Sequence, residues 1–144
     1  MSFEDLPRDW AQRPLTDPDI FEDVVDLVTR EKSRAAGAIM LLLCHPDGRM
    51  LQPIAIEDDT GPVALEVVDD GLRALLSGLV QHGMEHVVIV IARPGGVEVT
   101  EQDRHLKAVF EAGCCAAGME LLGLAVAAPE GVVAIPTGRS SDAA

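Results

Sequence analysis

The chain has 144 residues, the length of one ordinary domain, and 48% of them are hydrophobic, so it can bury a substantial core. That core must be mainly aliphatic, because the sequence contains three Phe, one Trp and no Tyr. Twenty-four acidic and 11 basic side chains give a net charge of −13, which repels phosphate backbones and anionic lipid surfaces. We therefore expect neither a nucleic acid nor a membrane as partner.

Two further features predict a cytoplasmic location. No apolar run reaches the roughly 18 residues that a bilayer-spanning helix needs, and the first residues, Met-Ser-Phe-Glu-Asp-Leu-Pro, contain no apolar signal region. Cys44, Cys114 and Cys115 lack the spacing of a disulfide framework, so we expect them to be free, buried thiols.

Residues 1–16 contain prolines and mixed charge and are typical of an irregular arm. A domain over residues 17–136 is expected to begin with one helix that Thr16 or Asp17 caps and that ends before Gly37. Residues 38–44 form a continuous apolar run, which predicts a strand buried on both faces. After an Asp-Gly hairpin turn, residues 50–56 are expected to return as a strand. It either lies at an edge of the sheet or bulges at Pro53, because proline has no N–H to donate.

The second half alternates helices and strands. Leucines and valines recur at spacings of three and four from residue 65 towards Gly83, which predicts a helix. A β-branched strand is expected over 86–92, a helix over 100–118, and a hairpin of strands over 121–128 and 132–135, before a tail at 137–144. The order α-β-β-α-β-α-β-β predicts a single α/β (α+β) domain with helices flanking a mixed sheet in three layers.

One stretch carries a family resemblance. The strand ends in Ile91-Ala-Arg93-Pro-Gly95-Gly96, the next helix begins with Thr100-Glu-Gln-Asp103, and the following strand contains Gly-Leu at 123–124. This pattern resembles the RadC-like branch of the JAB/MPN (JAMM) domain family, in which His-x-His-Pro-Ser-Gly precedes Ser-x-x-Asp and then an Asp-His pair. The likeness covers roughly residues 38–136 and implies a cytidine-deaminase-like architecture.

The resemblance also implies what this chain lacks. In the family, two histidines and the aspartate hold a zinc ion with an open position, and a glutamate from an earlier strand acts through the bound water. Here Ile91 and Arg93 stand at the histidine positions, and a guanidinium that stays protonated repels a cation. No acid appears in the earlier strand before Glu57. We therefore expect no metal, no cofactor and no catalytic residues of the family type.

Two interpretations of the remaining motif stay open. Thr100 and Asp103 have the spacing of a helix capping box, and the segment from Arg93 to Gly96 has the composition of a turn. Alternatively, Arg93, Gly95, Gly96, Thr100 and Asp103 form a binding site, in which the arginine and a helix N-terminus attract a small anion or a carboxylate of a partner.

Two functions follow. The favoured hypothesis is a non-catalytic module that binds a ligand or a protein partner, or self-associates as a homodimer, through a sheet edge or an exposed helix face. The alternative is a divergent metal-dependent hydrolase with a rearranged site drawn from Asp103, Glu57, His105 or Cys44. The missing imidazoles favour the first. His82 and His86 do not predict another metal site, because Gly83 and a strand start separate them.

Overall fold

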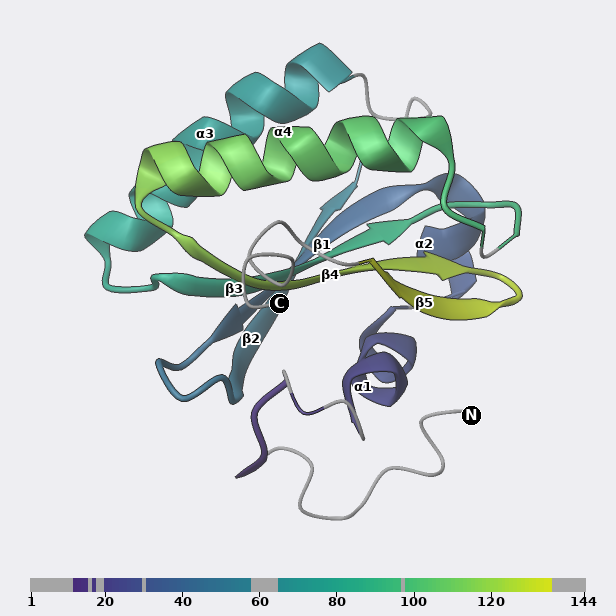
Figure 1. The fold of residues 1–144 in the computed structure, drawn as a ribbon, viewed down its shortest axis with the longest axis horizontal. Coiled ribbons are helices and arrows are strands. Elements are labelled where there is room, and N and C mark those ends of the chain that lie inside the picture. The colour runs from purple at the N-terminus through teal and green to yellow at the C-terminus, as the bar shows by residue number, and fades with distance from the viewer. Residues whose placement is uncertain are drawn as a thin grey trace, which may run out of the picture.

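A computed structural model describes residues 12–15, 17, 20–29, 31–57, 65–96 and 98–135 of the chain. These residues form one five-stranded mixed sheet with helices on both faces, so the expected mixed α/β domain is confirmed (Figure 1). The helices are α1 (Phe21–Val28), α2 (Glu31–Ala36), α3 (Leu65–Gln81) and α4 (Glu101–Ala117). The strands are β1 (Ala38–Cys44), β2 (Met50–Glu57), β3 (His86–Ala92), β4 (Glu120–Ala128) and β5 (Gly131–Ile135).

The strand order is β2-β1-β3-β4-β5. Three neighbouring pairs are antiparallel, and β3 and β4 are parallel. A parallel pair cannot be joined by a tight hairpin, so α4 carries the chain back across the sheet. The carboxyl ends of β3 and β4 consequently lie side by side, with Ala92 opposite Ala127. The expected edge position of β2 is confirmed, and Pro53 pairs with Leu42 of β1 alone.

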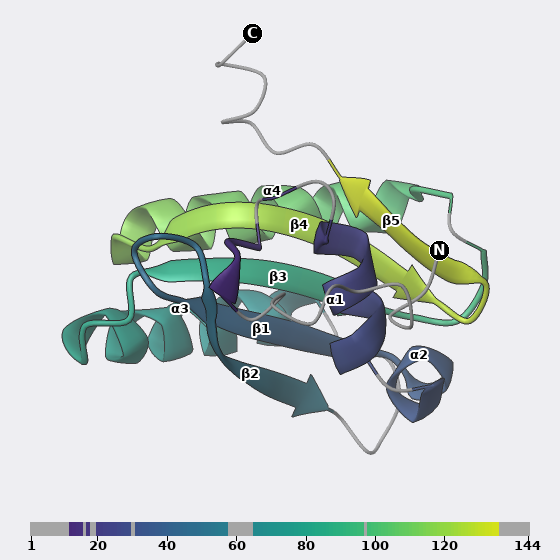
Figure 2. The same ribbon diagram turned by 90° about the horizontal axis from the view of Figure 1, so that it is seen from below.

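The helices lie in two layers. Figures 1 and 2 show α3 and α4 across one face of the sheet and α1 on the other. Because alternate side chains of a strand point to opposite faces, β1 contributes side chains to two separate cores. The core under α3 and α4 contains Ile39, Leu41, Leu43, Leu76, Leu106 and Phe110. The core under α1 contains Leu15, Val24, Val25, Met40, Leu42 and Cys44.

The expectation of one continuous first helix is wrong. The helix stops at Val28, Thr29 adopts an extended conformation, and α2 begins at Glu31. The interruption turns α2 back so that Arg34 donates from Nη2 to the Asp26 carbonyl at 3.0 Å and to its carboxylate at 2.9 Å. Arg34 Nη1 also reaches the carbonyl of Ala128 at 3.3 Å. The side chain therefore ties the end of α1 to the end of β4.

The described part of the N-terminal arm is anchored to the sheet. The backbone N–H of Leu15 donates to the Gly48 carbonyl in the β1–β2 turn at 2.8 Å, and its side chain is fully buried. The expected tail at 137–144 lies outside the described residues. Within the described residues, no helix is both long and apolar enough to cross a membrane.

Gly123 lies where Phe21 of α1 packs closely on β4. A Cβ atom there would lie 3.0 Å from Phe21 Cε1 and 3.3 Å from Cζ. We expect Gly123→Val to lower the free energy of unfolding by roughly 1–3 kcal/mol, because the phenyl ring must move. Denaturant unfolding measures the change, and Phe21→Ala should cost less in the Gly123→Val protein than in the wild type.

Gly78→Ala provides the matched control. A Cβ at Gly78 in α3 meets nothing within 4 Å. Alanine forms helix better than glycine, so this substitution should raise the free energy of unfolding by up to about 1 kcal/mol. An equal loss of stability in both variants would contradict the Phe21 contact as the cause.

Candidate functional site

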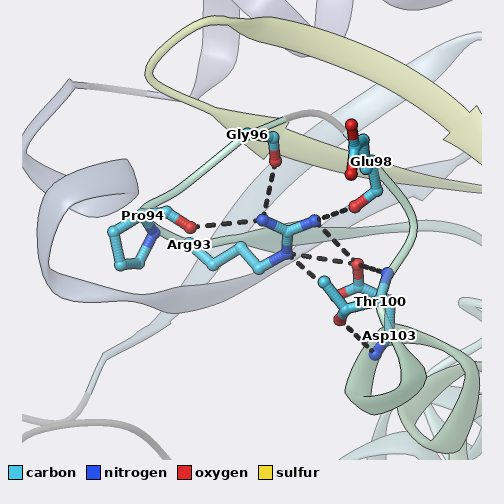
Figure 3. Close-up of polar contacts among 6 residues, drawn as sticks. All are labelled: Arg93, Pro94, Gly96, Glu98, Thr100 and Asp103. Atoms are coloured by element: carbon cyan, nitrogen blue, oxygen red, sulfur yellow. Dashed lines mark hydrogen bonds and ion pairs between the residues drawn. The ribbon is translucent and has the colours of Figure 1, made fainter.

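Arg93 and Asp103 join the end of β3 to the first turn of α4 (Figure 3). Arg93 Nη2 lies 2.8 Å from Asp103 Oδ2, and Nε lies 3.0 Å from Oδ1 and 3.2 Å from Oδ2. The carboxylate therefore meets one side of the guanidinium with both oxygens. The Asp103 side chain is 1% exposed and that of Arg93 18%, so this ion pair is screened far less than a surface pair.

The remaining guanidinium donors bind the loop that follows β3. Nη1 donates to the carbonyls of Pro94 at 3.2 Å and Gly96 at 2.8 Å, and Nη2 donates to the carbonyl of Glu98 at 2.6 Å. An arginine has five N–H groups, and each has an acceptor here. The loop is thus wrapped around the guanidinium with three carbonyls turned inward. The Gly95 backbone, at φ +99°, has a conformation that favours glycine.

The predicted capping box of α4 is present. Thr100 Oγ1 accepts from the Asp103 backbone N–H at 3.1 Å, and Asp103 Oδ2 accepts from the Thr100 N–H at 2.9 Å. Burial of Asp103 opposes its ionisation, but hydrogen bonds from Arg93 and the Thr100 backbone outweigh it and hold the pKa of this carboxyl below its usual range. The carboxylate is therefore both a helix cap and the partner of Arg93.

The structure brings all five predicted site residues together around this loop. The N–H groups of the Arg93 guanidinium and the backbone N–H groups of Thr100 and Asp103, however, already donate to acceptors of this chain. The turn interpretation and the capping interpretation describe the observed contacts. An anion at Arg93 stays a prediction, and it requires that the anion displace at least one protein acceptor from the guanidinium. Gly96 lies beside Glu130 of the β4–β5 turn: a Cβ atom added to Gly96 would lie 3.3 Å from Glu130 Oε2. An acidic side chain therefore lies next to the loop at which an anion would bind.

The residues at this position do not fit a catalytic zinc ion. Ile91 belongs to the core under α3 and α4, Arg93 is a cation, and both oxygens of Asp103 already accept hydrogen bonds. Leu124, where the resemblance implies a histidine, is also buried in that core. Zinc needs about three protein ligands with N, O or S donors, and this position offers one carboxylate.

Among the other candidate residues, Glu57 and Cys44 lie at opposite ends of the sheet: Glu57 is opposite Ala38, at the end where Arg93 follows β3. Cys44 is opposite His86, at the end of the sheet where β3 begins, whereas Arg93 follows the end of β3. His86 Nε2 instead lies 3.2 Å from Glu120 Oε2, and His82 Nδ1 lies 2.9 Å from the Gly78 carbonyl. His105 is exposed on α4. Among the described residues, no three His, Cys, Asp or Glu side chains form a group suited to a metal ion.

The acceptors that surround Arg93 were not identifiable from the sequence. Pro94, Gly96 and Glu98 contribute backbone carbonyls, which every residue type carries, so no residue pattern marks them. The glycines and the proline indicate only that the loop turns sharply.

No protein-family model and no curated protein matches the chain. The JAB/MPN resemblance therefore rests on the residues quoted above.

Asp103→Asn should lower the free energy of unfolding by about 2 kcal/mol at pH 7, since it weakens charge-assisted hydrogen bonds. The folded-state pKa lies below the unfolded-state value of about 4. The ionised side chain therefore stabilises the fold fully above that pH, and the stabilisation is lost as pH falls through the folded-state pKa. Denaturant unfolding at several pH values should show the wild type approaching the variant below about pH 4.

Asp47→Asn is the control for this titration. The pKa of Asp47 is also lowered, chiefly by a hydrogen bond from the Arg49 backbone, but its side chain is 55% exposed. Solvent screens such a pair, so the variant should follow the wild-type pH curve closely. A wild-type curve parallel to that of Asp103→Asn across the acid range would contradict the assigned role of Asp103.

The expectation of three buried thiols is wrong for one of them, because Cys115 is exposed on α4. Burial raises the pKa of both the Cys44 and the Cys114 thiol to about 12. We expect a disulfide reagent to modify Cys115 alone in the native protein at neutral pH, and all three cysteines in denaturant. Cys115→Ser should abolish the fast native reaction, and rapid labelling of this variant would contradict the packing of the two cores.

Proposed function

We propose that this chain is a non-catalytic JAB/MPN-like domain, related to the RadC branch, that acts as a protein-interaction or ligand-binding module in the cytoplasm. The observation that carries the proposal is the guanidinium of Arg93, bound to Asp103 where the family resemblance implies a metal ion. The positive charge of the guanidinium thus compensates the buried carboxylate, so no metal ion is needed for that purpose.

The placement of the replaced residues supports the proposal. Ile91 packs in the same core as Leu106 of α4, and Arg93, two residues later, reaches Asp103 of the same helix. Positions 91 and 93 therefore face α4 together, as two ligands from a strand would face a third ligand from a helix. Side chains at these two positions point towards the same helix, but an aliphatic group and a guanidinium cannot bind a metal ion.

The surface favours polar partner contacts. Leu27 and Leu51 are the exposed large hydrophobic side chains among the described residues. Both sheet edges are also partly blocked: Pro53 removes a donor from β2, and the N–H of Ala134 in β5 donates to Glu22 Oε2 at 3.3 Å. We therefore expect a partner to meet the exposed face of α4 or the loop after β3, rather than to add a strand.

Zinc binding tests the proposal and its hydrolase alternative together. Dialysis against zinc followed by elemental analysis should find no stoichiometric metal in the wild type. The Ile91→His/Arg93→His variant restores two imidazoles beside Asp103 and should bind about one zinc ion per chain, provided circular dichroism shows it folded. Adding Asp103→Ala should abolish that binding, and Arg93→His alone should bind weakly.

The opposite result would support the alternative. Stoichiometric zinc in the wild type that is lost in Asp103→Ala would identify a divergent metal site. Hydrolysis of an amide or isopeptide substrate that depends on Asp103 would do the same. Either outcome would overturn the non-catalytic proposal.

A further inference from the structure

Three backbone carbonyls of the loop after β3 surround one planar cation, the guanidinium of Arg93. We infer that the loop and the N-terminus of α4 form a guanidinium-binding site that Arg93 of the same chain occupies, and that the site binds a free alkylguanidinium when this side chain is removed. The inference goes beyond the proposed function and does not depend on it, because it rests on the contacts around Arg93 alone.

The acceptors match the edges of a guanidinium. The Asp103 carboxylate spans Nε and Nη2, the Glu98 carbonyl takes the second Nη2 hydrogen, and the Pro94 and Gly96 carbonyls take those of Nη1 (Figure 3). These contacts measure 2.6–3.2 Å from donor to acceptor. A compact ammonium has three donors on one nitrogen atom and cannot reach the Asp103 carboxylate and all three carbonyls at once. The arrangement therefore selects shape as well as charge.

The carboxylate is held in place independently of Arg93. Its Oδ2 accepts from the Thr100 N–H, and the Asp103 N–H donates to the Thr100 hydroxyl. Helix α4 is in turn anchored by Leu106 and Phe110 in the core. Removing Arg93 therefore takes the Nε donor away from Oδ1 of a carboxylate that is 1% exposed in the wild type. Such an unpaired charged acceptor is costly, which favours uptake of a matching donor from solution.

The site is also accessible. The Arg93 side chain is 18% exposed, and Pro94, Gly95 and Gly96 are exposed. The Arg93→Ala substitution deletes the side chain beyond Cβ, and N-ethylguanidinium contains the heavy atoms that are deleted. This small molecule carries the same donors to the loop carbonyls and to Asp103.

Thermal unfolding of Arg93→Ala with millimolar N-ethylguanidinium tests the inference. The melting temperature should rise with the logarithm of the ligand concentration above the dissociation constant, by roughly 3–6 °C at ten times that constant. Ethylammonium at equal ionic strength and calcium chloride should have little effect. The wild type, whose site is filled, should not respond, and neither should Arg93→Ala/Asp103→Asn, which lacks the charged acceptor.

Three results would overturn the inference. One is the absence of a rise in the melting temperature of Arg93→Ala with N-ethylguanidinium. Another is an equal shift with ethylammonium or calcium, which would show a site for any cation. The third is an equal shift in the wild type. If Arg93→Ala is unfolded in buffer, the same titration is followed by far-ultraviolet circular dichroism: recovery with N-ethylguanidinium alone supports the inference, and no recovery overturns it.

Discussion

Parallel pairing of β3 and β4 obliges the chain to leave the sheet at Ala92 and to return through α4, and the Arg93–Asp103 ion pair fixes where that return begins. The pair joins the end of β3 to the first turn of the helix. Since α4 covers the core that Ile91, Leu106 and Phe110 share, its starting point also sets how one face of the sheet is covered. A local electrostatic contact therefore lies at the point from which α4 begins to cover this face of the sheet.

A second arginine also binds backbone carbonyls at the end of a strand and of a helix. Arg34, from α2, binds the carbonyl of Ala128 at the carboxyl end of β4 and the end of α1 at Asp26. Arg34 Nε is buried without a hydrogen-bond partner in the structure, whereas every N–H of Arg93 has one. In a chain with a net charge of −13, few cations are available. Arg34 and Arg93 both bind backbone carbonyls near the carboxyl ends of β3 and β4, where the ladder of strand hydrogen bonds stops and these carbonyls need other donors.

Periodicity predicted the elements that bury regular faces. The uninterrupted apolar runs became β1 and β3 at residues 38–44 and 86–92, and Thr100 caps α4 as its spacing indicates. The misses depend on contacts between distant segments. Beyond the break after Val28, Arg34 contacts Asp26 and Ala128, and Leu15 is buried where its N–H binds the β1–β2 turn. Neither contact leaves a pattern in the local sequence.

Under the proposed function, Arg93 explains how the fold tolerates the loss of a metal. A carboxylate buried at the start of α4 needs a nearby positive charge, and without one its burial would be strongly unfavourable. Replacing a metal-binding histidine by an uncharged side chain would leave Asp103 uncompensated. An arginine supplies the charge and, unlike a metal ion, also gives the three loop carbonyls their donors. The same contacts that make the site unsuitable for zinc therefore keep β3, the loop and α4 in one arrangement.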